Sequence, residues 1–415
     1  MIHALPSDAA AAPIAVAWLS SGPTGAQNYD EFAADAEIED LLREQPTSLL
    51  SVEMPHCTPE ARAQGLAFDA ALPAARERLE SLKREGLLTR VEDAVLAYRI
   101  TGPEVDAHAA VVLMATKEIS NGPDEPGRVI RNEEVFPEKV QQRAELVRTL
   151  GHLTSPILLL QVTGARELDE LLREAVASAP LEPTVSDVDQ LGQRHELWLV
   201  PPGERRDRIL ELVGTSEHLV ADGNHRSLAV QLVPVDRFLA VVTTTRSLRI
   251  KPYNRLLRSL PFPPHELLSR LRERRFEVRR AQGPAVPGEP DRIQAYFGPG
   301  DVHELRLPPA AGSIVDRLPH TLVERELFGG VLGLHAGDHD IVYVGGDYGL
   351  DYLTGEVDRG AAAAALLLPA VSSDDFVDVN RARQAMPRKS TWFTPKARAG
   401  LVLAEVEVGE RAPSP

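Results

Sequence analysis

Cysteine is almost absent from this sequence, since Cys57 is the only one among 415 residues. A single thiol excludes an internal disulfide framework and a zinc site built from several cysteines. Cys57 follows His56 in a segment bounded by Pro55 and Pro59. We interpret it as a buried or incidental thiol rather than a nucleophile.

Basic residues are also scarce, because 45 Lys and Arg stand against 61 Asp and Glu, a net charge of −16. Phosphate backbones and anionic membranes attract basic surfaces, so this balance argues against general nucleic-acid binding and against membrane association. A small-molecule substrate that is neutral, zwitterionic or chelated to a metal remains compatible with it. The oligomeric state is left open.

Long apolar runs are missing as well. The longest, 361–371, is interrupted by Pro369. It has about half the length of a membrane span, so we predict a buried strand there. Residues 1–13 carry Asp8 and no Lys or Arg, which does not fit the charge pattern of a signal peptide. We therefore expect a cytoplasmic protein.

The patterns that are present favour an α/β fold class. Helical and strand periodicities alternate, which predicts a mixed sheet covered by helices. We expect helices over 72–85, 139–153, 167–178, 205–213, 226–232, 322–328 and 373–385, and strands over 94–101, 109–115, 156–162, 196–200, 218–221, 238–243, 341–344 and 365–368.

Three loop-like stretches, at 20–25, 121–127 and 282–290, suggest how the chain is divided. Residues 282–290 contain three prolines and two glycines, which cannot continue a helix or a central strand, so this is the best candidate linker. We expect an N-terminal α/β region over 1–127, a core over 128–281 and a smaller C-terminal α/β region over 291–415.

The segment His218–Ala229 carries the strongest chemical signal. An apolar strand runs into Asp222-Gly223-Asn224-His225-Arg226 and then into a helix. Gly223 permits a tight turn, the following N–H groups favour an anion at a helix N-terminus, and Arg226 suits a phosphate. Asp222 and His225 have the chemistry of a Mg²⁺ ligand, a base or an acid. The same residues also fit a junction in which Asp222 and Asn224 merely cap the helix.

Two further segments are candidates. Met386–Lys396 interleaves three cations with Ser390 and Thr391, which resembles phosphate-binding chemistry in composition but lacks the glycine-rich loop of a Walker motif. A basic surface turn is the alternative. In Arg131-Asn132-Glu133-Glu134, Glu133 is a candidate base or metal ligand, and a solvated acidic turn is the alternative.

Four blocks of this sequence resemble the domain-of-unknown-function 1015 family. Asn28-Tyr29-Asp30 is similar to the family's early Pro-Tyr-Asp, and 129–156 to its His-Glu block with the arginine-bearing helix and Ser-Pro strand start. Residues 221–229 resemble its Ala-Asp-Gly-His-His-Arg signature. Met386–Lys396 with Gly400-Leu401 resembles its terminal signature, Met-Pro-x-Lys-Ser-Thr-x-Phe-x-Pro-Lys.

A more distant resemblance concerns Gly223-x-x-Arg226-x-x-Ala229 followed by a strand at Phe238, which is similar to the nucleotide-binding motif of ParB and sulfiredoxin-type folds. That superfamily includes enzymes that phosphorylate free serine with ADP or ATP. The resemblance therefore implies a ParB/sulfiredoxin-like core with a nucleotide phosphate at the turn of residues 223–226.

Three family histidines are asparagine here: Asn132, Asn224 and Asn254. Asparagine can still donate to a phosphate, but it cannot act as a general acid near neutral pH. The family positions that are retained are His225, Glu133, Arg226 and Arg255.

These observations lead to one main hypothesis, a nucleotide-dependent phosphotransferase of free serine or a similar hydroxyl compound, with Mg²⁺ and ATP or ADP. The nucleotide phosphates are assigned to Gly223, Asn224, Arg226, Arg255, Lys389, Ser390 and Thr391, the catalytic roles to Asp222, His225 and Glu133, and the metal to Asp222. A non-catalytic nucleotide- or metabolite-binding regulatory protein and a phosphohydrolase are the alternatives.

Overall fold

The computed structural model describes residues 9–103, 105–122, 124–131 and 133–409. The chain divides into two compact units. Unit 1 comprises Met1–Leu248 and Pro395–Pro415, and unit 2 comprises Arg249–Thr394. Unit 1 is therefore assembled from two stretches of sequence that are separated by the whole of unit 2.

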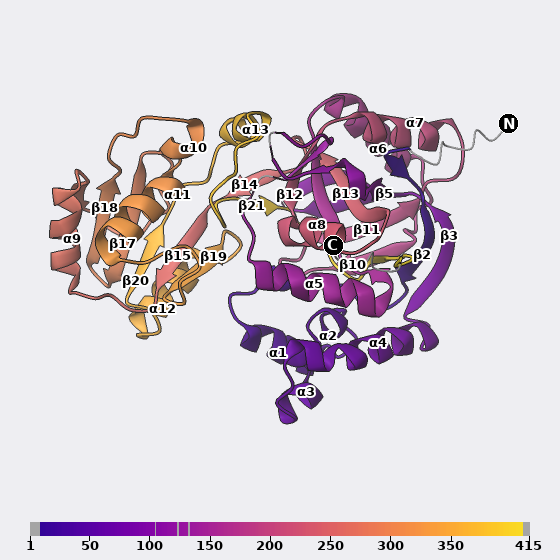
Figure 1. The fold of residues 1–415 in the computed structure, drawn as a ribbon, viewed down its shortest axis with the longest axis horizontal. Helices are drawn as coiled ribbons and strands as arrows, with labels where there is room; N and C mark the ends of the chain where they lie inside the picture. The colour runs from indigo at the N-terminus through magenta and orange to yellow at the C-terminus, as the bar shows by residue number, and fades with distance from the viewer. Residues whose placement is uncertain (1–8, 104, 123, 132, 410–415) are drawn as a thin grey trace, which may run out of the picture. The chain divides into compact units, whose positions relative to one another are not determined.

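Unit 1 is built on a mixed ten-stranded sheet (Figure 1). Its strands, in spatial order, are β10 (Val185–Val188), β11 (Arg194–Leu199), β4 (Leu96–Gly102), β5 (Val105–Ala115), β13 (Arg237–Thr244), β9 (Ile157–Gln161), β12 (His218–Asp222), β7 (Val129–Ile130) and β6 (Ile119–Ser120), with β1 (Ala11–Ala12) pairing β5. The pairs β9–β13, β7–β12 and β6–β7 are parallel, and the other pairs are antiparallel. The predicted mixed sheet is confirmed.

A second, antiparallel sheet in unit 1 has the order β3 (Leu88–Ala94), β2 (Ile14–Ser20), β22 (Val402–Glu405), β8 (His152–Leu153). The helical elements of unit 1 are η1 (Tyr29–Glu31), α1 (Asp35–Glu44), α2 (Leu50–Glu53), η2 (Pro55–Cys57), α3 (Pro59–Ala63), α4 (Phe68–Arg84), η3 (Thr116–Glu118), α5 (Pro137–Leu150), α6 (Ala165–Ala177), α7 (Glu204–Thr215) and α8 (Asn224–Leu232). Figure 1 shows α5 between α8 and the layer that contains α1, α2 and α4.

The sequence explains why α4 and α5 form and pack. Leu72, Leu79 and Leu82 recur at helical spacing on α4, and all three are buried in one apolar cluster with Leu146 and Leu150 of α5. Helix α5 begins with Pro137 at its first turn and ends at Gly151, whose φ of +63° lies in the left-handed region that helix C-caps use. Arg143, Leu146 and Val147 of α5 line the cavity of the candidate site.

Unit 2 contains an antiparallel six-stranded sheet of order β16 (Glu277–Arg280), β18 (Asp301–Arg306), β17 (Arg292–Gly298), β20 (Ala364–Leu367), β15 (Tyr253–Leu257) and β19 (Ile341–Gly345), and a separate pair, β14 (Arg249–Lys251) with β21 (Trp392–Thr394). Its helices are α9 (Pro264–Glu273), α10 (Ile314–Arg317), α11 (Pro319–Leu322), the π-helical η4 (Val323–Leu332), α12 (Leu350–Asp358) and α13 (Ser373–Arg381). The apolar run at 361–371 contains β20, whose four residues are all buried.

The division of the chain differs from the three regions expected from sequence. The segment 282–290, expected to be a linker, connects β16 to β17 inside unit 2. Both of these strands pair with β18, so the proline-rich segment is a loop within one sheet. Within the described ranges, no helix combines the length and the apolar character that crossing a membrane requires.

Candidate functional site

The turn between β12 and α8 is the centre of the candidate site. Strand β12 ends at Asp222, and α8 begins at Asn224, as the strand–turn–helix pattern predicted. Gly223 has a φ of +94°, and a Cβ at this position would lie 3.1 Å from the Nε atom of Arg226. Glycine is therefore required here for two reasons, its backbone conformation and the close approach of the Arg226 side chain.

Arg226 connects three segments that are distant in sequence. It is buried, its Nη2 donates to Oδ2 of Asp222 at 2.5 Å, and its Nη1 donates to Oδ1 of Asn28 at 3.0 Å and to the carbonyl oxygen of Pro156. Burial opposes its charge, but the Asp222 carboxylate outweighs this and raises the pKa of Arg226. Both terminal nitrogens thus bind groups of the protein itself, and the phosphate-binding role expected from sequence stays a prediction.

Lys396, from the block Met386–Lys396, also contacts Asp222. Its Nζ donates to Oδ1 of Asp222 at 2.6 Å, and its side chain is 11% exposed. Burial lowers the pKa of Lys396, but the nearby carboxylates of Asp222 and Glu31 have the larger effect and raise it. Each oxygen of Asp222 therefore accepts a hydrogen bond from a different cation.

Gly400 allows the chain after Lys396 to approach the backbone of Thr24 closely. Its φ is +76°, and a Cβ there would lie 2.4 Å from the carbonyl oxygen of Thr24. The hydroxyl of Thr24 donates to the carbonyl oxygen of Gly400 at 2.8 Å. The segment that carries Lys396 is thereby fixed beside the segment that leads to Asn28.

Glu31 has a strongly shifted pKa and lies in the same network. It is buried in η1, where its Oε1 accepts from the backbone N–H of Asn28 at 3.0 Å and from Nδ2 of Asn28 at 2.7 Å. Burial raises the pKa of Glu31 to about 7, although the charge of Lys396 acts in the opposite direction. A carboxyl group that titrates near neutral pH is suited to accept and release a proton.

A small cavity lies next to this network. Its volume is about 30 Å³, room for roughly two water-sized groups. The polar side chains that line it are Tyr29, Glu53, Arg143, Thr154, Ser155 and Arg226. Arg143 is buried and stacks on the ring of Tyr29, with its Cζ 4.2 Å from the ring centroid.

Two charged groups of this cavity have unused polar atoms. Within the described ranges, Nε and Nη1 of Arg143 and Oε2 of Glu53 have no hydrogen-bond partner. The other oxygen of Glu53 accepts from the hydroxyls of Thr154, at 2.7 Å, and Ser155. Leaving buried charged atoms unpaired is costly, so the cavity is suited to a polar guest.

The remaining predicted residues of unit 1 are placed as follows. His225 is buried, its Nε2 accepts from the backbone N–H of Phe136 at 3.1 Å, and its ring stacks on the Phe136 ring. Asn224 is buried, and its Oδ1 has no hydrogen-bond partner in the described part of the chain. Glu133 is half-buried between β7 and α5, where its charge acts on Arg131. Asn132 lies outside the described residues.

The other predicted phosphate ligands lie in unit 2. Arg255 is fully buried, with Nη1 donating to the carbonyl oxygen of Tyr253 at 3.0 Å and Nη2 donating to that of Arg388 at 3.4 Å. Lys389, whose φ is +52°, has its Nζ 5.7 Å from the centre of the Tyr253 ring. The structure thus brings Arg255 and Lys389 to the same part of unit 2.

The two hydroxyl residues beside Lys389 differ in burial. Ser390 is fully buried, with no partner for its hydroxyl among the described residues, and Thr391 is half-buried. Asn254 is buried as well, and its Oδ1 accepts from the backbone N–H of Leu368 at 3.0 Å. A phosphate site shared by Arg226 and Lys389 would join two units, and it stays a prediction.

The donor set at Asp222 fits a metal ion only in part. Both carboxylate oxygens already accept from cations, so a Mg²⁺ ion would compete with Arg226 and Lys396 for them. Oxygen is nevertheless the ligand atom that Mg²⁺ prefers, and each oxygen keeps a further lone pair. The metal role of Asp222 stays a prediction.

Comparison with known proteins gives one family and several solved structures. The model of a family described as "Protein of unknown function (DUF1015)" matches residues 24–324, a range that stops before the Met386–Lys396 block. Among curated proteins, none matches this sequence.

The similar structures include free serine kinase in complex with AMP, at 13% identity, covering 71% of this chain and 90% of that chain with a TM-score of 0.39. A conserved hypothetical protein from Pyrococcus furiosus is 12% identical, covering 70% and 95% with a TM-score of 0.37. SbnI with a C-terminal truncation, from Staphylococcus aureus, is 12% identical, covering 70% and 85% with a TM-score of 0.38. TM-scores this low assign no function.

Proposed function

The chain belongs to the DUF1015 family of proteins of unknown function, and from its own side chains we propose that it is a nucleotide-dependent phosphotransferase that acts on a hydroxyl group of a small molecule. The observation that carries the proposal is Glu31, a buried carboxyl group whose pKa is raised to about 7 by burial. It lies in the same charged network as Lys396 and Asp222. A proton acceptor beside a buried cation is what hydroxyl activation requires.

The nucleotide phosphates are assigned to the start of α8. The first N–H groups of a helix and the helix dipole favour an anion, and Gly223 and Asn224 form this start. Lys396 supplies a positive charge next to it, through its pairing with Asp222. Arg226 has a positioning role, because its terminal nitrogens hold Asp222, Asn28 and Pro156 in place.

The acceptor is assigned to the cavity between Arg143 and Glu53. Arg143 offers two unpaired guanidinium nitrogens, and Glu53 offers one unpaired carboxylate oxygen. A zwitterion such as a small amino acid presents a carboxylate for the first and an ammonium group for the second. This arrangement supports free serine, or a similar hydroxyl amino acid, as the substrate class, and it requires the cavity of about 30 Å³ to widen when the acceptor binds.

The chemical step needs little covalent participation from the protein. The acceptor's hydroxyl oxygen bonds to the terminal phosphorus of the nucleotide while the bond from that phosphorus to the bridging oxygen breaks. The hydroxyl proton passes to Glu31, and the shortened nucleotide leaves. Asp222 would hold Mg²⁺, which when bound neutralises phosphate charge.

The proposal is tested by incubating the protein with radiolabelled ATP or ADP, Mg²⁺ and a set of hydroxyl amino acids, and by following transfer of the label. We expect transfer to at least one acceptor, with loss on the order of a hundredfold or more in Glu31→Gln. Glu44→Gln, on the exposed end of α1, is the matched control and should remain active. No transfer with any acceptor, or an active Glu31→Gln variant, would contradict the proposal.

Acceptor binding gives a second test, which does not require turnover. Arg143→Met should abolish the thermal stabilisation by the amino acid that accepts phosphate, whereas Arg76→Gln, at an exposed position of α4, should retain it. Equal stabilisation of both variants would place the acceptor elsewhere.

One observation favours a second candidate, a regulatory protein that binds a nucleotide without turnover. His225 uses its Nε2 to accept a backbone N–H, and Asn224 stands where the family signature has histidine, so neither position supplies a general acid. Nucleotide-induced stabilisation without any transfer of label would support this candidate. Release of inorganic phosphate without an acceptor would instead identify a phosphohydrolase.

A further inference from the structure

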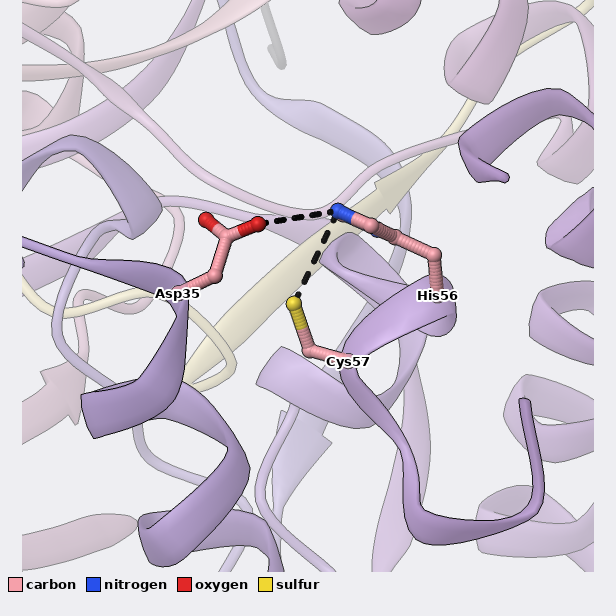
Figure 2. Close-up of side chains that lie close together, drawn as sticks. All are labelled: Asp35, His56 and Cys57. Atoms are coloured by element: carbon pink, nitrogen blue, oxygen red, sulfur yellow. Dashed lines mark hydrogen bonds and ion pairs between the residues drawn. The ribbon is translucent and has the colours of Figure 1, made fainter. Parts of the chain in front are cut away.

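A cluster of three different metal-ligating side chains lies outside the proposed site. Asp35 is the first residue of α1, and His56 and Cys57 belong to η2. Figure 2 shows the carboxylate of Asp35 and the sulfur of Cys57 both directed at the same imidazole nitrogen of His56. Their ligand atoms all lie within 4.8 Å of one another.

The contacts do not form a catalytic relay. Nε2 of His56 is 3.5 Å from Oδ2 of Asp35 and 3.6 Å from Sγ of Cys57, so a single nitrogen meets both partners. A relay needs the two nitrogens of the ring to face different partners.

The same spacings do fit a shared metal ion. Around a tetrahedral Zn²⁺ with bonds of about 2.0–2.1 Å to nitrogen and oxygen and about 2.3 Å to sulfur, the nitrogen and oxygen atoms are roughly 3.3 to 3.4 Å apart, and the nitrogen and sulfur atoms roughly 3.5 to 3.6 Å. The separations from Nε2 of His56, 3.5 Å to oxygen and 3.6 Å to sulfur, are close to these values, and the Asp35 and Cys57 ligand atoms lie within 4.8 Å of each other. Nitrogen, sulfur and oxygen ligands together are typical of zinc.

The guanidinium group of Arg62 lies beside this cluster. Nη2 of Arg62 lies 2.6 Å from Oε1 of Glu39, 3.4 Å from Oδ2 of Asp35 and 3.9 Å from Sγ of Cys57. The Arg62 side chain is 39% exposed, so it can turn into solvent without breaking the core. Glu39, one helical turn after Asp35, then becomes available as the fourth ligand.

We propose that Asp35, His56 and Cys57 form a zinc site, with Glu39 or water in the fourth position and Arg62 as the cation that zinc displaces. On binding, the Cys57 thiol gives its proton to water and the zinc keeps its oxidation state. The ion would tie α1 to η2, and thereby the segment after Glu31 to the segment after Glu53. The site does not depend on the proposed function.

The test uses the full chain, freed of metal with a chelator and then titrated with Zn²⁺ or Co²⁺. We expect one Zn²⁺ per chain, and with Co²⁺ the visible bands of tetrahedral coordination together with a sulfur-to-cobalt charge-transfer band. Cys57→Ser should remove the charge-transfer band, and His56→Gln should weaken binding on the order of a hundredfold. Arg62→Gln should tighten it by about tenfold.

Two controls locate the ion. Asp40→Asn alters an exposed residue of α1, and His339→Gln alters a second acidic and histidine group at 338–340, so neither should change binding. No stoichiometric binding, a charge-transfer band that survives in Cys57→Ser, or loss of binding in His339→Gln would each overturn the proposal. If Cys57→Ser does not fold, the loss of zinc affinity in His56→Gln decides the question, because His56 is only half-buried and its replacement should be tolerated.

Discussion

Nζ of Lys396 lies 2.6 Å from Oδ1 of Asp222, although 174 positions separate the two residues in sequence. The pair is nearly excluded from water, with side chains 11% and 13% exposed. Asp222 also accepts from Arg226, so one carboxylate holds two cations in a protected environment. Such a group is stable only while all its members are present.

Removal of Lys396 is therefore expected to destabilise unit 1. Lys396→Met should lower the free energy of unfolding by about 3 kcal/mol, because Asp222 keeps its charge and loses a partner. The double variant Asp222→Asn/Lys396→Met should cost less than the sum of the single variants. Urea unfolding of the four proteins measures this coupling, and additive losses would show that the pair is not coupled.

Glu31 should make stability depend on pH. Its pKa in the folded protein, about 7, lies above the ordinary value of 4.5, so the folded state holds this proton more tightly than the unfolded chain. The contribution is complete below pH 4.5 and is lost as the pH rises through 7. Relative to Glu31→Gln, the wild type should lose on the order of 3 kcal/mol over this range. Urea unfolding of both proteins from pH 4.5 to 8 measures it, and parallel pH curves would contradict the raised pKa.

Gly223→Ala should be more costly than an alanine at a similar backbone conformation elsewhere. Gly192 also has a positive φ, +72°, but a Cβ there would meet nothing within 4 Å. Both substitutions strain the backbone by roughly 1–2 kcal/mol, and only Gly223→Ala also displaces Arg226. Thermal unfolding compares the two variants. Equal losses of stability would mean that the Arg226 side chain moves aside with no loss of free energy.

Asn224→His restores the residue type of the family signature at the start of α8. The buried Oδ1 of Asn224 has no partner among the described residues, so this position is not required for internal hydrogen bonding through that atom. If the family histidine acts on the leaving phosphate, the variant should transfer phosphate faster on the order of a hundredfold. An unchanged or slower rate of phosphate transfer would show that a histidine at position 224 does not assist the reaction in this protein.

The helices and strands that the apolar pattern predicted are present in the structure, although many short elements were not predicted. The expected helix at 72–85 is α4, Phe68–Arg84, and the expected strand at 156–162 is β9, Ile157–Gln161. Each carries apolar residues at the spacing of a single helix or strand, which can be recognised without knowing the rest of the fold. The strand–turn–helix around Gly223 was accessible for the same reason.

The roles of charged residues could not be predicted in this way. The hydrogen bonds of Arg226 to Asp222, Asn28 and Pro156 depend on the packing of three distant segments, so they could not be read from sequence, and its role as a phosphate ligand stays a prediction. Glu31 was missed because its raised pKa follows from burial. One local signal was present, the Asn28-x-x-Glu31 spacing, in which Glu31 accepts from the backbone N–H of Asn28.

The division of unit 1 into two stretches has a consequence for the growing polypeptide. Strand β22 lies between β2 and β8 in its sheet, and Lys396 completes the Asp222 pair, so neither contact can form before residues 396–405 have been translated. The contiguous unit 2, Arg249–Thr394, is fully translated before that point. A ribosome that pauses within unit 2 therefore exposes a first unit with a gap in one sheet and an interior carboxylate that has only Arg226 of its two cations, a state that chaperones and proteases recognise.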